Sequence, residues 1–161
     1  GTATRAGSSA ATRTATAAGG AGGAYTDPTG ACRATVPAGF TPLAGAAGVF
    51  SDQGALLTLS AQDTGGQPFG AWARTIPEQI AATPQVQGFA PGRTEQTADS
   101  YRLDYTLASS SLFPGAASAT IAARPGPGLT ACVLQVFWPQ GQEARYGPIA
   151  EAAIASLGPQ R

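Results

Sequence analysis

Apolar and polar residues alternate along several short stretches of the chain, and this alternation predicts β-strands with one buried and one exposed face. The clearest stretch is residues 100–107. Its apolar positions are Tyr101, Leu103, Tyr105 and Leu107, and its polar positions include Arg102, Asp104 and Thr106. Residues 32–36 alternate in the same way and place Cys32 on the apolar face. A sheet with one face packed on a core is therefore expected.

A hairpin is predicted in the first half of the chain. Residues 49–51 and 55–61 flank the short connection Asp52-Gln53-Gly54. A connection of this length with glycine at its end is typical of a β-hairpin, in which the two strands pair antiparallel. Residues 119–123 predict a further, weaker strand.

The most apolar stretch of the chain is residues 129–138. Its alternating positions Cys132, Leu134, Val136 and Trp138 share one face. Because Val133 and Phe137 make the opposite face apolar too, we expect this strand to be central in the sheet or covered on both sides.

Two stretches are predicted to be helical. Residues 75–82 form a short helix with Pro77 tolerated in its first turn. Residues 142–157 form a longer one, with apolar positions at helical spacing: Tyr146, Ile149, Ala150, Ala153, Ile154 and Leu157. Gly158-Pro159 is a typical helix end. The elements together predict an α+β fold, an antiparallel β-sheet packed by a short mid-chain helix and a long C-terminal helix.

The start of the chain differs from the rest in composition. Residues 1–23 consist of Ala, Thr, Gly and Ser with two Arg and contain no large apolar residue. Such a segment buries too little surface to offset its ordering entropy, so we expect a disordered tether. The predicted organisation is this tether, a single α+β domain over residues 24–158, and a tail over residues 159–161. The start at Gly1 indicates a trimmed chain.

The two cysteines, Cys32 and Cys132, are 100 positions apart and belong to no metal-binding spacing. This separation favours one structural disulfide, which in the loop-entropy model stabilises the fold by ~4 to 5 kcal/mol. The alternative is two unrelated buried thiols in a cytosolic protein. A disulfide indicates an oxidising compartment.

The disulfide and the tether together indicate an extracytoplasmic protein. A tether of this composition commonly follows a removed signal peptide or a lipidated cysteine, so we expect the protein to be secreted or lipid-anchored at the cell envelope. Peripheral membrane association would then occur through a removed N-terminal anchor. A cytosolic linker is the alternative interpretation of the same segment.

Charge and composition exclude several classes of function. Nine cationic residues, all Arg, balance nine carboxylates and are scattered along the chain, so no basic face for nucleic acid is predicted. The chain contains no His and no Lys, which removes the usual bases of hydrolase triads and all imidazole metal sites. No glycine-rich phosphate loop occurs. We therefore predict no catalytic residue, no metal site and no cofactor.

The order of motifs resembles that of a known fold family. These motifs are Tyr25-Thr26-Asp27 before a turn, Val36-Pro37-Ala38-Gly39-Phe40, the hairpin at Ser51-Asp52-Gln53-Gly54, and a final helix closing with Ala155-Ser156-Leu157. They resemble the PsbP-like family over residues 24–158. That family includes the photosystem PsbP subunit, the yeast Ran-binding import factor, LpqN-type actinobacterial lipoproteins and many other bacterial envelope proteins.

The resemblance implies an α/β/α sandwich around an antiparallel sheet. It further implies a protein used for binding or assembly, without enzymatic activity. It transfers no functional residue to this chain, because the family's members have unrelated partners and a shared fold does not define a function.

Two groups of aromatic residues suggest a ligand cleft. Phe69, Trp72 and Arg74 lie together before the short helix, and Trp138 and Tyr146 lie around the entry to the last helix. If the groups meet, they line an apolar cleft for a lipid, a glycan or a partner peptide. The alternative is that these rings are core residues.

Three functions therefore compete. The first is a non-catalytic binding or assembly module of the bacterial cell envelope, a monomer with a protein, lipid or glycan partner. The second is a carboxylate-dependent enzyme on envelope glycans, which requires two acids facing each other across the cleft of Trp72 and Trp138. The third is a purely structural domain.

Overall fold

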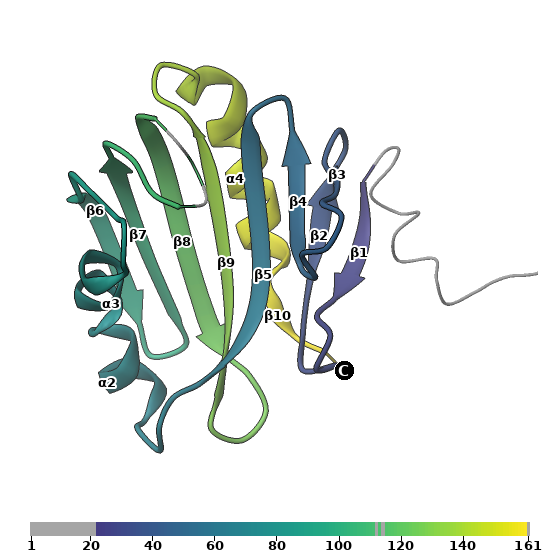
Figure 1. Cartoon of the computed structure of the whole chain (residues 1–161). Helices are drawn as coiled ribbons and strands as arrows, with labels where there is room; N and C mark the ends of the chain where they lie inside the picture. Colours follow the sequence, from purple (N-terminus) through teal and green to yellow (C-terminus); the bar gives the residue numbers. More distant parts are fainter. Residues whose placement is uncertain (1–21, 112, 114, 161) are drawn as a thin grey trace, which may run out of the picture.

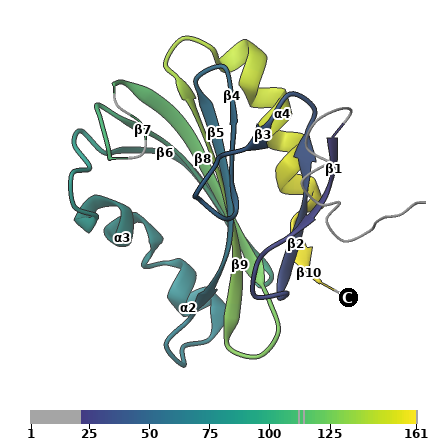
Figure 2. The same ribbon diagram turned by 45° about the vertical axis from the view of Figure 1, so that its right-hand side comes forward.

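The computed structural model describes residues 22–111, 113 and 115–160 and arranges them in three layers (Figure 1). The middle layer is a seven-stranded sheet. One of its faces carries a long helix together with a small three-stranded sheet, and the other face carries two short helices (Figure 2). This is the α+β architecture that the sequence predicts, with its antiparallel sheet, short mid-chain helix and C-terminal helix.

All pairs of neighbouring strands in the large sheet are antiparallel. From one edge to the other, the strands are β3 (Thr41–Pro42), β4 (Val49–Asp52), β5 (Ala55–Asp63), β9 (Thr130–Pro139), β8 (Ala117–Pro125), β7 (Ser100–Leu107) and β6 (Ala90–Thr97). The apolar strand β9 is central and buried on both faces, as predicted. In β7, buried residues alternate with half-buried ones along the whole strand, which confirms the period of two.

The small sheet consists of β1 (Gly22–Thr26), β2 (Cys32–Pro37) and β10 (Gly158–Pro159), with β2 in the middle. Two predicted boundaries were wrong here. The strand β1 begins two residues inside the segment predicted as a tether, and Pro159 of the predicted tail pairs with Cys32 in the sheet. Residues 1–21 and Arg161 lie outside the described part of the chain.

Three helices complete the described fold: α2 (Phe69–Ala73), α3 (Ile76–Ala82) and α4 (Glu143–Ser156). The helices α3 and α4 match the two predicted ones to within one residue at each end. In α4 the predicted apolar positions face the sheets, with Tyr146, Ala150 and Ala153 buried. Within the described residues, no helix combines the length and apolar character needed to cross a membrane.

Local sequence explains the best-predicted turn. The hairpin between β4 and β5 turns at Gln53 and Gly54, whose φ angles are +46° and +93°. Positive φ at both central residues is the geometry that matches the twist of paired strands, and glycine adopts it without steric penalty.

The elements missed at the sequence level include the two-residue strands β3 and β10, the strand β6 and the helix α2. All eight residues of β6 are exposed, so this edge strand has no apolar face to produce an alternating pattern. The helix α2 has only five residues and includes Gly70, in a segment rich in Gly and Gln.

The core is divided by the large sheet into two apolar clusters. The first lies between this sheet, β2 and α4, and the second lies between the sheet and the short helices α2 and α3. The Cys32–Cys132 disulfide is buried in the first cluster, where it joins β2 to β9 with a Cα–Cα distance of 5.5 Å. The predicted disulfide is thus confirmed.

Candidate functional site

The residues predicted to form an aromatic cleft lie on opposite faces of the large sheet. Phe69 and Trp72 belong to the α2/α3 side, and Arg74 is exposed beside them. Trp138 and Tyr146 belong to the α4 side. The sheet separates the two groups, so the structure does not bring them together. Each tryptophan is only 5% exposed and packs in its own cluster.

A groove of about 500 Å³ lies instead on the α4 side of the sheet, beside the helix. It exists because α4 packs over β2, β8 and β9 and leaves much of β6 and β7 uncovered on this side (Figure 2). Its principal polar and aromatic lining residues are Arg102, Asp104, Ser118, Thr120, Trp138 and Glu143. Of the residues predicted for the cleft, Trp138 contributes to this groove.

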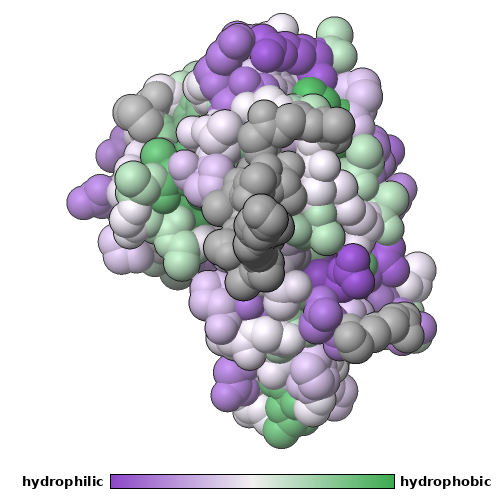
Figure 3. All heavy atoms as spheres, turned by 90° about the vertical axis from the view of Figure 1, so that its right-hand side faces the viewer, coloured by the Kyte–Doolittle hydropathy of each residue, from purple (hydrophilic) through white to green (hydrophobic). Residues whose placement is uncertain are grey.

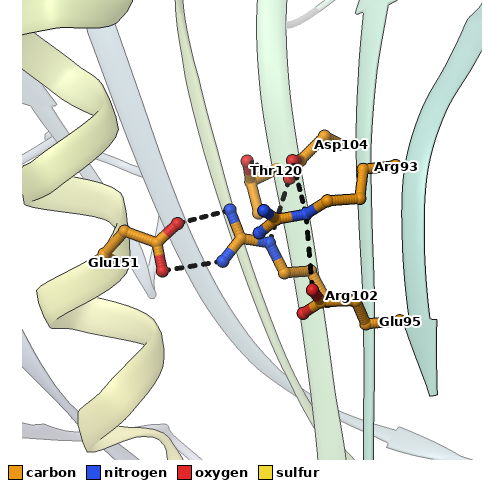
Figure 4. Close-up of polar contacts among 6 residues, drawn as sticks. All are labelled: Arg93, Glu95, Arg102, Asp104, Thr120 and Glu151. Carbon is orange, nitrogen blue, oxygen red and sulfur yellow. Dashed lines mark hydrogen bonds and ion pairs between the residues drawn. The ribbon is translucent and has the colours of Figure 1, made fainter.

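Arg102 is held on one side of the groove by two carboxylates (Figure 4). Its Nε donates to Asp104 Oδ1 at 3.1 Å, and its Nη1 and Nη2 reach the two Glu151 oxygens at 2.7 and 2.5 Å. The hydrogen bond to Glu151 is the main cause that raises the pKa of Arg102, and the same contact lowers the pKa of Glu151. Each of the three guanidinium nitrogens therefore has a carboxylate partner within the protein.

Asp104 receives two further contacts. Thr120 Oγ1, on a side chain that is almost fully buried, donates to Asp104 Oδ1 at 2.8 Å. Arg93 Nε lies 3.6 Å from Asp104 Oδ2. The carboxylate thus forms the centre of a network that spans β6, β7 and β8.

Glu143, in the first turn of α4, presents a second carboxylate to the groove. Ser118 Oγ donates to its Oε2 at 2.6 Å, and the Gly141 N–H donates to its Oε1 at 3.1 Å. The Ser118 hydrogen bond is the main cause that lowers the pKa of Glu143. No guanidinium pairs with this carboxylate among the residues that the structure describes.

The indole N–H of Trp138 is buried at the same place and has no hydrogen-bond partner within the described chain. It contributes slightly to lowering the pKa of Glu143, so it lies near that carboxylate without meeting the geometry of a hydrogen bond. Buried donors without an acceptor are uncommon in native proteins.

The groove suits noncovalent binding better than acid–base chemistry. A general acid must hold a proton near neutral pH, whereas hydrogen bonding lowers the pKa of Glu143, and Asp104 is paired with two guanidinium groups. Within residues 22–111, 113 and 115–160, no cluster of three acidic or cysteine side chains can hold a metal ion.

A second hollow, of about 450 Å³, lies against β4 and the loop that precedes it. It is lined by small and apolar residues, among them Tyr25, Leu43 and Phe50. It lies on the β1 and β3 side of the molecule, where pale colours predominate and green areas are small and separate (Figure 3). Because none of its lining residues is charged, it has little to orient a polar ligand.

Sequence reasoning missed the groove because it depends on which strands become neighbours. The sequence pattern puts Asp104 on the polar face of its strand, and nothing in the local sequence indicates that it meets Glu143. The signal in the sequence was Ser118 and Thr120, two polar residues within a largely apolar stretch. The structure buries both of them on β8. Buried hydroxyl groups normally have a polar partner, and here each one donates to an acid of the groove.

Comparison with known proteins yields structural matches alone. No protein-family model matches the sequence, and no curated protein sequence matches it. The Ran-binding protein Mog1p of Saccharomyces cerevisiae matches with a TM-score of 0.59 and 10% identity, covering 85% of this chain and 94% of that one. A mutant Mog1 structure gives a TM-score of 0.60 and 10% identity, covering 86% of this chain and 96% of that one.

Cyanobacterial PsbP from Synechocystis sp. PCC 6803 matches with a TM-score of 0.53 and 10% identity, covering 86% of this chain and 92% of that one. Identity this low supports a shared fold and carries no residue roles. The resemblance expected from the sequence is confirmed at the level of the fold, and the chain has a PsbP-like fold.

Proposed function

We propose that this protein is a non-catalytic binding or assembly module whose binding site is the groove beside α4. The observation that carries the proposal is the groove itself, whose carboxylates are fixed by hydrogen bonds from buried hydroxyl groups beside Trp138. Sites that bind ligands are commonly concave and mostly apolar, with a few placed polar groups. One structural neighbour is described as a Ran-binding protein, which supports a protein partner.

The cell envelope is the proposed location. The Cys32–Cys132 disulfide supports it, because disulfides persist in oxidising compartments and are rare in the cytosol. Secretion and lipid anchoring are the two routes that we propose, and the protein acts as a monomer. Alkylation of the native protein before and after reduction tests this location: both thiols should react only after reduction, and free thiols in the freshly isolated protein would contradict it.

The competing enzymatic function has one observation in its favour, since Asp104 and Glu143 line the same groove as Trp138. A glycosidase of this kind needs one protonated carboxyl at working pH. The lowered pKa of Glu143 argues against that role. We therefore favour binding.

Site-specific photo-cross-linking in the source organism tests the binding function. Ala90 is exposed and lines the groove, and Ala81 is exposed on α3, on the other side of the sheet. We replace each in turn by a benzoyl-phenylalanine and irradiate the cells. A discrete cross-linked product from position 90 and none from position 81 is expected. Equal products from both positions, or none from either, would overturn the proposal.

A further inference from the structure

The charges that line the groove do not balance. They comprise one guanidinium, Arg102, and two carboxylates, Asp104 and Glu143. Arg102 is only 15% exposed and is already bound by Asp104 and by Glu151 from outside the lining. It is therefore not available to a negatively charged ligand. The groove retains a negative charge that the protein itself does not neutralise.

This unneutralised charge lies at Glu143. Its carboxylate is held ionised by the Ser118 hydroxyl and the Gly141 N–H, which are neutral donors. A carboxylate fixed by neutral donors keeps its full charge and a defined position. It is therefore prepared to accept an ion pair from outside the chain.

Trp138 lies beside this carboxylate in the same groove. Its side chain is 5% exposed, and its buried indole N–H contributes to lowering the pKa of Glu143. The indole therefore adds to the neutral surroundings that hold the Glu143 charge in place. A basic side chain of a peptide would supply the cation that this charge lacks.

The shape of the groove agrees with such a ligand. It borders the exposed edge strand β6 at Ala90, Pro91 and Gly92, where the pairing with β7 is interrupted between Pro91 and Thr94. Small side chains at this edge leave room for the aliphatic part of a lysine or arginine, which packs well on apolar surface.

We infer that the groove recognises a lysine or arginine side chain of a partner protein, with Glu143 as the residue that binds the cation. This inference rests on the proposed binding function and names the chemistry of its ligand. Asp104 is already shared between Arg93 and Arg102, so the charge left for the ligand is that of Glu143. Raised ionic strength should weaken the interaction, because salt screens exposed charges.

Titration with blocked tripeptides tests the inference. The probes are acetyl-Gly-Arg-Gly-amide and its neutral counterpart acetyl-Gly-Gln-Gly-amide. The readout is the indole N–H signals of the two tryptophans in the ¹⁵N-labelled protein. We expect the arginine peptide to shift the Trp138 signal and to leave the Trp72 signal, on the opposite face, unchanged. Glu143→Gln should weaken binding of the arginine peptide by about tenfold or more, as expected for loss of a charged hydrogen-bond partner.

A matched control uses Glu78→Gln, which removes the same charge from the exposed side of α3, and it should bind like the wild type. A blocking variant adds a steric test: a Cβ at Gly147, which lines the groove, meets no atom within 4 Å, so Gly147→Leu should fold and abolish binding. Ala152→Leu, on an exposed position of the same helix, should not.

Two outcomes would overturn the inference: equal shifts with the glutamine peptide, or unchanged affinity in Glu143→Gln. Neither outcome decides the proposed function. A cross-link from position 90 without any response to the arginine peptide would retain a binding groove and reject a cationic ligand. If position 90 gives no cross-link and the arginine peptide gives no response, both the binding function and the cationic ligand are rejected.

Discussion

The two faces of the large sheet are covered by different means. On the α2/α3 face, aromatic rings pack on one another, with Tyr105 and Phe113 both 6.4 Å from the Phe137 ring between centroids. On the α4 face, a disulfide and a second sheet fix the covering layer to β9. The buried hydroxyl groups of Ser118 and Thr120 lie at the border of this covering layer, where they line the groove.

This difference shows how a small domain combines a closed core with an open site. The α2/α3 face depends on apolar area, so it has little room for buried charge. The α4 face has a covalent bond, which stabilises its layers independently of the groove. Each face nevertheless retains one buried donor without a partner among the described residues, Tyr101 Oη on one and Trp138 Nε1 on the other.

The largest effect is expected from removing the disulfide, which belongs to the α4 face alone. The double variant Cys32→Ala/Cys132→Ala should lose ~4 to 5 kcal/mol of unfolding free energy, since the bridge closes a loop of 100 residues. The midpoint of urea unfolding measures this loss. Reduction of the wild type should give a similar midpoint, and an unchanged midpoint would show that α4 and β2 are held without the bridge.

A loss of ~3 to 5 kcal/mol is expected for Trp72→Ala on the opposite face, because a buried tryptophan leaves both lost contacts and a cavity. Thermal unfolding measures this effect, with Trp72→Phe as the milder control. Peptide binding at the α4 groove should be retained at temperatures where the variant is folded. A stable variant with impaired ligand binding would instead return Trp72 to a binding site.

An intermediate effect that depends on pH is expected at Asp27, which accepts the Cys32 N–H at 2.8 Å beside the disulfide. Burial alone would raise the pKa of Asp27, but hydrogen bonds from Thr29 and the Cys32 N–H outweigh it, and the pKa is lowered from 3.8. Asp27→Ala should cost ~1 to 3 kcal/mol at neutral pH, because the buried Cys32 N–H loses its side-chain acceptor.

Because the pKa of Asp27 is lowered in the folded protein, its charge stabilises the fold at neutral pH and ceases to do so in acid. The contribution of the Asp27 charge is fully present above pH 3.8 and is lost as the pH falls through the lower folded-state pKa. Urea midpoints of the wild type and Asp27→Ala should therefore converge below pH 3.8. A constant difference between them would show that the charge is not involved.

The smallest effect is expected at the rim of the groove. Glu151→Gln removes a pair between a 15% exposed Arg102 and a 54% exposed Glu151, so a loss of ~0.5 to 1 kcal/mol is expected. Glu95→Gln removes the same charge from a pair exposed by more than half on both sides and should change stability by less than ~0.5 kcal/mol. Equal losses of unfolding free energy in the two variants, measured by urea unfolding, would show that the ion pair at the groove stabilises the protein no more than an exposed surface pair.

The sequence predicted those elements whose burial is periodic. The alternation of β7 and the double apolar face of β9 come directly from the side chains that each strand buries. The strand β6 could not be predicted from a burial pattern, because it buries no side chain. Local patterns therefore define an element only when the core selects its residues.

The candidate site was harder to predict, because it depends on sheet order. Trp72 and Trp138 are both buried aromatic residues, and nothing in their local sequence assigns them to opposite faces. Asp104 lies on β7, and Glu143 lies at the start of α4, which follows β9. The two acids line one groove because only β8 separates β7 from β9 in the sheet. Such proximity is a property of the whole topology.

The position of β2 between β1 and β10 also has a consequence for the timing of folding. Its two partners come from opposite ends of the described chain, since β1 precedes it directly and β10 includes Pro159. Contacts between residues so distant in sequence form slowly, because the loop between them must close first. During synthesis the small sheet cannot be completed until Gly158 and Pro159 have left the ribosome. Until then β2 has β1 as its only partner in the small sheet, and its other edge stays open for pairing.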